Sequence, residues 1–299
     1  MHRLLIAFSL ILASSCAPKT SNKPAGLKNA SIINGAEVKS SDTLASSIVG
    51  VYNTKEKMIC TGTIIAPNIV LTAAHCVPER AFHVKIVFTN NIDDTMNTRE
   101  QDMLRELVLS ATDFKVSTKW DPKNDSIEFD TGDIALIKFK GEIPKGFKPA
   151  KFLTDENALK VGNMVTVAGF GVDEINSNQI DPKKYRNIDE AIEYGEVICD
   201  GELHSKNITC FEIEASGDGI LRATSAPIAS LFETEVRLDE RKTGTCNGDS
   251  GGPAFIQSNG EYFLFGVTSR GSAFCNEVGV YTNALYYKNW IEETSKLLK

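Results

Sequence analysis

Short apolar or alternating runs, each ended by turn residues, are the feature that most constrains how this 299-residue chain can fold. A run of this length is typical of a β-strand, whose side chains alternate between two faces, and the Gly, Pro, Asn and Asp residues between the runs favour turns. The pattern predicts an all-β barrel or sandwich with strands in residues 47–52, 61–76, 83–88, 133–139, 163–172, 262–269 and 279–284.

The C-terminal end of the chain has the periodicity of a helix. Its apolar residues recur with polar residues between them, at Leu285, Trp290, Ile291, Leu297 and Leu298. A helix that packs against a core on one side has this pattern. We therefore expect a C-terminal helix over about residues 285–298.

Residues 90–106 and 173–193 are polar and charged and show no strand pattern. Such a composition indicates surface loops or short exposed helices. Asn91, Asp93 and Asp94 offer oxygen ligands of the kind that calcium binds, but no ligand spacing marks a site. We favour a solvated loop here and expect no metal.

The first residues have the features of an export signal. His2 and Arg3 precede an apolar run over residues 4–12, which is followed by the small residues of "ASSC". The run is too short to span a bilayer and is typical of a signal peptide, here residues 1–15. The expected cut lies before Cys16.

The sequence "LASSC" also resembles the bacterial lipoprotein box, whose cysteine becomes the lipidated first residue. Ala13 stands where that box usually has Leu, so two interpretations remain: lipidation at Cys16, which we favour, and export without a lipid. A lipoprotein would lie at the outer membrane or in the periplasm, held to the membrane only by its lipid anchor. Residues 16–31 are polar, contain Pro and Gly, and indicate a tether.

Six of the 7 cysteines remain once Cys16 is set aside, and an even number in an exported chain indicates disulfides. The CxxC spacing that is typical of a metal site is absent. The sequence favours local pairings, which join Cys60 with Cys76, Cys199 with Cys210, and Cys246 with Cys275.

The chain carries a formal net charge of −7, and its first 31 residues contribute only positive side chains, so the remainder is more acidic still. An acidic surface repels phosphate backbones, and no basic stripe with interleaved aromatic residues is present. The sequence therefore argues against nucleic acid as a partner. It also lacks the glycine motifs of nucleotide-binding proteins and the HExxH motif of zinc proteases, so we expect no cofactor.

Three residues in separate segments carry the strongest chemical signal. His75 ends the apolar run "IVLTAAHC" and could act as a general base. Asp133 begins the apolar run "DIALIKF", at the edge of a core, where a carboxylate needs a partner. Ser250 lies in the glycine turn of "TCNGDSGGPAF". Each residue alone has an ordinary structural explanation, but the three in this order are far more specific.

These motifs identify a resemblance to a known family. "TAAHC", "DIALIKF" and "CNGDSGGP", with "IINGAEV" near the start and "GVYTNA" near the end, resemble the chymotrypsin and trypsin family of serine proteases over about residues 32–299. The resemblance implies two antiparallel six-stranded β-barrels, at about residues 32–150 and 151–284, with the active site between them and the helix following. It further implies a monomer that acts on proteins or peptides.

The resemblance also assigns chemical roles. Ser250 would be the nucleophile that forms an acyl-enzyme, His75 the general base, and Asp133 the group that orients the imidazole. The backbone N–H groups of Gly248 and Ser250 would form the oxyanion hole. Ser269 matches the serine that supports the aspartate.

Asp249 precedes the nucleophile and matches the family's activation switch. In that family, cleavage before a tetrapeptide such as "IING" frees an amine, here that of Ile32, which pairs with this aspartate. The full-length chain would then be a zymogen, and an activating protease would be its partner. Because residues 17–31 contain no cysteine, activation would also release the enzyme from its anchor. The bond follows Ser31, which argues against a trypsin-type activator.

The expected specificity pocket departs from that of trypsin-like members. Gly244 stands where those proteins have an aspartate, and Thr245 follows it, so we expect an uncharged base and no preference for Lys or Arg. Gly271 and Gly279 leave the pocket open, which suggests a medium or large apolar residue before the scissile bond. Arg270 stands where Trp is usual and could instead favour acidic substrates.

Two other classes of function compete with this interpretation. A non-catalytic, protease-like binding protein would keep the fold, although such proteins usually lose a triad residue, and all three are present here. A lipase or esterase would require a GxSxG elbow within an α/β alternation, and the sequence shows no such alternation.

Overall fold

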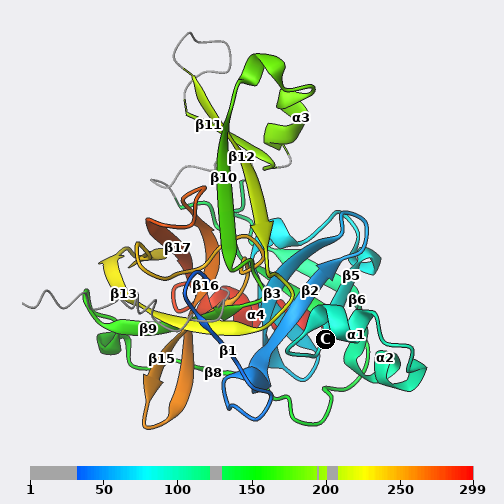
Figure 1. The fold of residues 1–299 in the computed structure, drawn as a ribbon. Helices are drawn as coiled ribbons and strands as arrows, with labels where there is room; N and C mark the ends of the chain where they lie inside the picture. Colours follow the sequence, from blue (N-terminus) through cyan, green and yellow to red (C-terminus); the bar gives the residue numbers. More distant parts are fainter. Residues whose placement is uncertain (1–31, 122–129, 194, 201–207, 299) are drawn as a thin grey trace, which may run out of the picture.

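The computed structural model describes residues 32–121, 130–193, 195–200 and 208–298. The signal peptide, Cys16, the tether and Ser31 lie outside the described residues. Two closed barrels and a projecting arm make up the fold (Figure 1).

The first barrel is formed by six antiparallel strands in the order β2-β3-β4-β7-β6-β5, and pairing of β5 with β2 closes it. The strands β3, β4 and β7 lie where the apolar runs predicted them. β6 is a strand that the sequence did not reveal, because its exposed polar residues hide the alternation. The strands are β2 Ile48–Asn53, β3 Met58–Ala66, β4 Ile69–Thr72, β5 Val84–Val87, β6 Val108–Val116 and β7 Ala135–Phe139.

The second barrel has the order β13-β14-β17-β16-β15-β9, and pairing of β9 with β13 closes it. Two short strands extend this sheet: β1, at Ala36–Glu37, pairs with β13, and β8, at Lys151–Phe152, pairs with β16. The barrel strands are β9 Met164–Gly169, β13 Arg222–Leu231, β14 Glu235–Asp239, β15 Pro253–Ser258, β16 Glu261–Gly271 and β17 Val278–Asn283. The expected two six-stranded barrels are thus confirmed.

The barrels pack against one another through apolar side chains. One buried cluster contains Val51 and Leu71 from the first barrel and also Phe255 and Val267 from the second. Burial of this apolar surface is the main favourable contribution to folding, so the relative position of the two barrels is set by the core. Residues at the interface between the two barrels are therefore held in fixed positions.

The helices are short and lie outside the barrels. The C-terminal helix α4, at Lys288–Leu297, buries Ile291 and Thr294, and turn residues precede it where the sequence suggested helix from 285. The polar stretch 90–106 forms the short helices α1, at Ile92–Met96, and most of α2, at Gln101–Leu107. No helix in the described part of the chain has the length and apolar character needed to cross a bilayer.

A three-stranded sheet forms an arm that projects from the two barrels (Figure 1). The strands β10, at Glu174–Ile180, β11, at Val197–Asp200, and β12, at Thr209–Ser216, pair in the order β10-β12-β11, and α3, at Ile188–Glu193, packs on β11. The expectation of only loops or short helices at residues 173–193 was wrong, because part of this stretch forms the strand β10. Its pairing with β12 supplies backbone hydrogen bonds that polar composition does not reveal.

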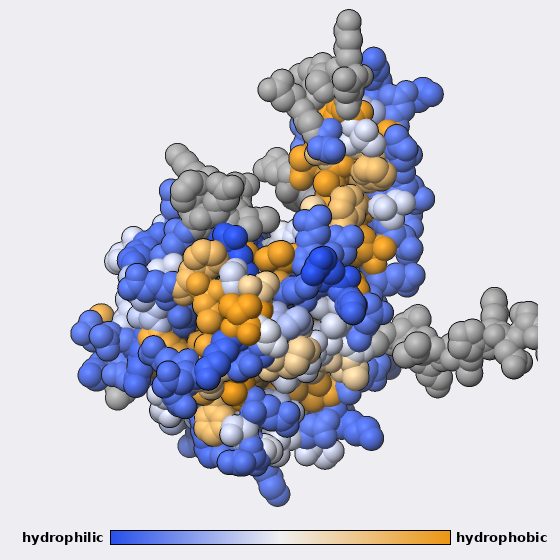
Figure 2. All heavy atoms as spheres, turned by 90° about the vertical axis from the view of Figure 1, so that its left-hand side faces the viewer, coloured by the Kyte–Doolittle hydropathy of each residue, from blue (hydrophilic) through white to orange (hydrophobic). Residues whose placement is uncertain are grey.

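The arm has a small apolar core of its own. Ala191, Val197 and Cys210 are buried, and partly buried side chains such as Ile188 surround them. Figure 2 shows apolar residues among polar ones along this projection. Cys199 and Cys210 face each other across β11 and β12 and form a disulfide.

Removing the arm disulfide should loosen the arm and leave the barrels folded. The two cysteines are separated by 11 residues, and a loop of this size is worth about 2–3 kcal/mol of local stability. In a Cys199→Ser, Cys210→Ser double variant we expect faster hydrogen exchange confined to β10–β12. The matched Cys60→Ser, Cys76→Ser variant opens a bond within the first barrel and should lower the global melting temperature. Equal loss of global stability in both variants would contradict an independently folded arm.

Candidate active site

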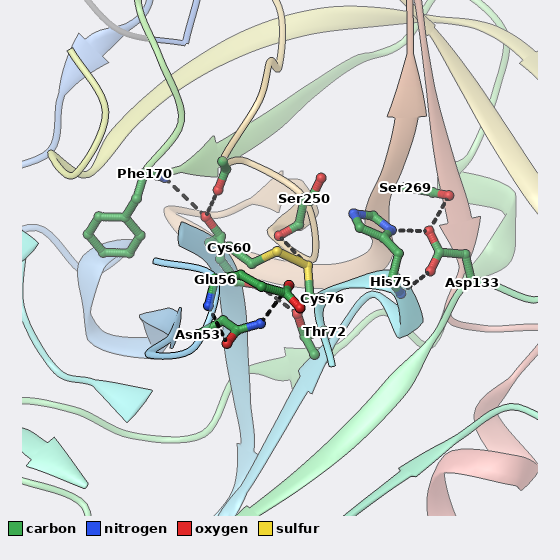
Figure 3. The surroundings of a disulfide bond; sticks show 12 residues. Asn53, Glu56, Cys60, Thr72, His75, Cys76, Asp133, Phe170, Ser250 and Ser269 are labelled. Atoms are coloured by element: carbon green, nitrogen blue, oxygen red, sulfur yellow. Dashed lines mark hydrogen bonds and ion pairs between the residues drawn. A yellow bond between two sulfur atoms is a disulfide. The ribbon is translucent and has the colours of Figure 1, made fainter. Parts of the chain in front are cut away.

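His75 lies on a tight turn that follows strand β4. The turn is a 3-10 helix over Ala74–Cys76, entered from the buried Ala73. A disulfide joins Cys76 to Cys60 on β3, so the turn is tied to the neighbouring strand (Figure 3). The backbone that carries the imidazole is therefore restrained on both sides.

Asp133 lies just before strand β7 and is only 2% exposed. One of its oxygens, Oδ2, is 2.8 Å from His75 Nδ1 and accepts a hydrogen bond of 2.6 Å from Ser269 Oγ. The other oxygen accepts the backbone N–H of His75 at 3.1 Å. The Thr282 hydroxyl also binds the Asp133 carbonyl. These bonds fix the carboxylate and favour the His75 tautomer that is protonated on Nδ1.

The two groups shift each other's pKa. Burial lowers the pKa of His75, but the adjacent Asp133 carboxylate outweighs this effect and raises it above 6.5. Burial raises the pKa of Asp133, but His75 and the Ser269 hydroxyl outweigh it and hold the pKa below its usual value. The carboxylate is therefore ionised at neutral pH, and an imidazolium formed beside it is stabilised.

The glycine turn that carries Ser250 is held by the first barrel. Thr61 on β3 donates its backbone N–H to the Ser250 carbonyl at 2.8 Å and its hydroxyl to the Gly248 carbonyl at 2.9 Å. Gly248 has φ +97°, which L side chains rarely adopt, and a Cβ there would lie 2.8 Å from the Gly171 Cα. Glycine at 248 is therefore required by both the backbone conformation and the close contact.

The geometry brings the three chemical residues together. Figure 3 shows the His75 ring between the Asp133 carboxylate and Ser250, with one ring nitrogen directed toward the serine. Within the described part of the chain, the backbone N–H groups of Gly248 and Ser250 donate to no protein acceptor. Two free N–H groups beside a serine hydroxyl are a suitable site for a developing oxyanion.

Asp249 is fully buried, with 0% exposure. Its carboxylate accepts N–H groups from Gly171 at 2.8 Å and from Cys246 at 2.9 Å. Burial nevertheless raises its pKa to about 7. Ile32, at the start of the described residues, is also fully buried, and Ile33 forms a β-bridge with Gly244. The described residues include no cation paired with Asp249.

A cavity of about 270 Å³ opens beside Ser250. Thr245, Arg270 and Gly271 line it, as the sequence suggested, together with Ser272 and Ala273, and the Cys246–Cys275 disulfide closes one side. Gly244 and Gly279 are not among the residues that line it.

Arg270 does not present a free charge to the cavity. Its guanidinium makes two hydrogen bonds to the buried Glu235, of 2.8 Å and 3.0 Å. This pairing corrects the suggestion that Arg270 selects acidic substrates. Sequence alone could not reveal it, because Glu235 is on another strand, β14.

The structure places a buried acid, Glu240, next to Gly244 and Gly279, which the sequence did not reveal. The side chain of Glu240, which is 3% exposed, fills the space between Gly244 and Gly279, so that a Cβ on either glycine would collide with it. Burial raises the pKa of Glu240 to about 7. The only sequence signal is an acidic residue directly after a strand, which is too common to single out.

The described residues offer little support for a metal site. Cys60, His75 and Cys76 cluster closely, but the two sulfurs are joined in a disulfide and are not free thiolates. Asn91 caps helix α1 by accepting the Asp94 backbone N–H at 3.0 Å, and its amide donates to the Asp94 carboxylate. The side chains of Asn91 and Asp94, two of the three residues considered for calcium, therefore satisfy one another locally.

Comparison with known proteins agrees with this geometry. The trypsin family model matches residues 32–291. Brachyurin of Leptuca pugilator is 26% identical over 243 residues, which are 78% of this chain and 86% of brachyurin. Chymotrypsin-like elastase family member 1 of Canis lupus familiaris is 26% identical over 277 residues, or 88% and 92% of the two chains. The solved structure of HL collagenase matches with a TM-score of 0.60 and 19% identity, over 89% of this chain and 99% of its own.

The fold is that of a two-barrel, chymotrypsin-like protein. The chain belongs to the trypsin family and is a serine endopeptidase. The resemblance inferred from the motifs is confirmed, and so is the enzyme class. Three disulfides in a chain of this family fit an exported protein.

The raised pKa of His75 can be measured directly. We expect NMR titration of the imidazole to give a value above 6.5 in the parent protein, and a lower value in Asp133→Asn, because the uncharged amide no longer stabilises the imidazolium. Ser269→Ala is the matched control: it removes one hydrogen bond but keeps the charge, so the pKa should stay above 6.5. An unchanged pKa in Asp133→Asn would contradict the electrostatic explanation.

Proposed function

We propose that this serine endopeptidase acts through a triad of Ser250, His75 and Asp133. The observation that carries the proposal is the fixed bond from His75 Nδ1 to the buried Asp133 carboxylate, with the other ring nitrogen facing Ser250 (Figure 3). The substrates are proteins or peptides, and the reaction is hydrolysis of a peptide bond through an acyl-enzyme.

In this mechanism, Ser250 Oγ attacks the scissile carbonyl carbon while His75 Nε2 takes the hydroxyl proton. The N–H groups of Gly248 and Ser250 donate to the oxyanion of the tetrahedral intermediate. His75 then gives its proton to the leaving amine, the C–N bond breaks, and an ester to Ser250 remains. Water attacks the ester with the same proton transfers and releases the acid product. Asp133 stays ionised and stabilises the imidazolium throughout.

We further propose that cleavage before Ile32 activates the enzyme. The buried Asp249 has no cation partner among the described residues, and an isolated buried charge costs several kcal/mol. The free amine of a new Ile32 terminus would supply the missing charge. In support, the following residue, Ile33, already pairs with Gly244 in the segment that leads to Asp249.

We extend the proposal to the N-terminal region, which lies outside the described residues. Lipidation at Cys16 would hold the unprocessed chain at the membrane, and the polar tether would keep the barrels clear of it. Cleavage before Ile32 would then both activate and release the enzyme. The activating protease would prefer a bond that follows serine.

The triad is tested with chains that begin at Ile32. Replacing the nucleophile in Ser250→Ala should lower peptide hydrolysis roughly 10⁶-fold. Ser272→Ala is a matched control, because Ser272 lines the same cavity without a proposed role in the chemistry. Products from a peptide mixture are identified by mass spectrometry. Equal cleavage by Ser250→Ala and the parent chain would exclude the triad, and no cleavage by a folded parent chain would favour a non-catalytic binding protein.

The activation switch has a signature in stability. In the unprocessed chain, residues 17–299, the pKa of Asp249 is about 7, against 3.8 for a free side chain. At pH 5 the unfolded chain has already lost this proton, whereas the folded chain loses it near pH 7. The free energy of unfolding therefore falls as the pH rises from 5 to 8. The pKa of Glu240 is also raised to about 7, so this residue acts in the same direction. Pairing with the Ile32 amine lowers the pKa of Asp249, so the fall is smaller in the cleaved chain.

Urea unfolding midpoints at pH 5 and pH 8 compare the two forms. Asp249→Asn provides the control, because without this carboxylate cleavage should no longer change the pH dependence. Identical pH dependence of the unprocessed and cleaved parent chains would count against the ion pair.

A further inference from the structure

A largely buried ion pair lies at the edge of the cavity beside Ser250. Arg270 on β16 lines the cavity, and its side chain is only 14% exposed. Its guanidinium donates to both oxygens of Glu235, at 2.8 Å and 3.0 Å. Glu235 is on β14, and β14 and β16 both pair with β17. A pair with two parallel hydrogen bonds holds the guanidinium in one orientation.

The same guanidinium reaches the hydrogen bonds of the triad acid. Arg270 Nη1 donates to Ser269 Oγ at 3.3 Å, and that hydroxyl donates to Asp133 Oδ2 at 2.6 Å (Figure 3). Arginine has no acceptor, so Ser269 accepts in the first contact and its one hydrogen is left for Asp133. Arg270 thus favours the orientation of the hydroxyl that supports the triad.

A β-bulge makes this arrangement possible. Consecutive residues of a strand point to opposite faces of a sheet, yet Ser269 and Arg270 both direct their side chains to the segment before β7. The register of β16 against β17 shifts between Thr268 and Arg270, where one extra residue changes the alternation. Because Arg270 Nη1 also lies 3.4 Å from Thr131 Oγ1, the ion pair joins the second barrel to the segment that carries Asp133.

The surroundings of the pair contain several other titratable groups. They are Lys119, Asp121 and Asp130 before β7, Glu233 before β14, and Tyr286 and Tyr287 before α4. Burial raises the pKa of Tyr287, so this phenol is uncharged at neutral pH. A guanidinium that lost Glu235 would be an unbalanced positive charge next to the hydrogen bonds of Asp133, and it would oppose protonation of His75.

We propose that Arg270 and Glu235 are positioning residues for the catalytic triad. Arg270 directs the Ser269 hydroxyl to Asp133. Glu235 balances the charge of the guanidinium, which would otherwise oppose the imidazolium that forms at His75. The inference rests on the proposed function and adds two residues to it, both of which act through the triad acid and not on the substrate.

The role of the charge is tested with Glu235→Gln, because glutamine keeps the length of the side chain and one acceptor. We expect the His75 pKa to fall, so that the ratio of kcat/KM at pH 6 to that at pH 8 rises about threefold. The sign is the same if the guanidinium turns toward Asp133. Glu261→Gln is the matched control, because Glu261 pairs with Lys151 on the surface, at the start of β16. Its pH profile should match that of the parent chain.

A double variant, Glu235→Gln with Arg270→Met, separates orientation from charge. It has no unbalanced charge, so the pH profile should return to that of the parent chain. Its kcat should be about 3- to 10-fold lower, because the Ser269 hydroxyl is no longer directed. A parental kcat would overturn the role of Arg270. This variant replaces the whole buried pair by uncharged side chains, so it keeps the inference testable if Glu235→Gln fails to fold.

NMR titration of His75 tests the pair without any catalysis. In a Ser250→Ala chain that begins at Ile32, adding Glu235→Gln should lower the imidazole pKa, and adding Glu261→Gln should not. A lowered pKa together with a parent chain that cleaves no peptide would support the pair and reject the proposed function. An unchanged pKa in the folded Glu235→Gln chain, with a parent chain that cleaves normally, would overturn the inference and leave the proposed function standing.

Discussion

The hydrogen-bonded carboxylate of Asp133 is the interaction on which the rest of the site depends. His75 and Asp133 come from the first barrel, whereas Ser269, which also binds Asp133, comes from the second. The Ser250 turn belongs to the second barrel but is held by Thr61 of the first. The site therefore exists only when the two barrels are packed together, and the apolar core between them sets its geometry.

Two further acids, Asp249 and Glu240, are buried, and their burial raises their pKa values. Asp249 and Glu240 both have pKa values raised to about 7 by burial, and neither has a cation partner among the described residues. A partner that arrives later can therefore gain a large electrostatic stabilisation. For Asp249 we assign that partner to the chain's own new terminus. The two acids lie close enough that the Glu240 charge also raises the pKa of Asp249.

Much of the fold was predictable, because apolar strands between turns leave a clear periodicity. The strands in the motifs around His75 and Asp133 were expected, as were the barrels and the C-terminal helix. The arm was missed because its strand β10 is largely polar and exposed, so backbone pairing with β12 and not burial defines it. Glu240 was missed because an acid after a strand has no distinguishing pattern.

The sequence by itself determined the family and the residues of the proposed triad, because both depend on residue types within short segments. Only the tertiary structure decided which side chains meet: that Arg270 binds Glu235, and that Glu240 packs between Gly244 and Gly279. Such pairs join residues that are close in space but lie on different strands. Their energies depend on distance and burial, which no local pattern of residues encodes.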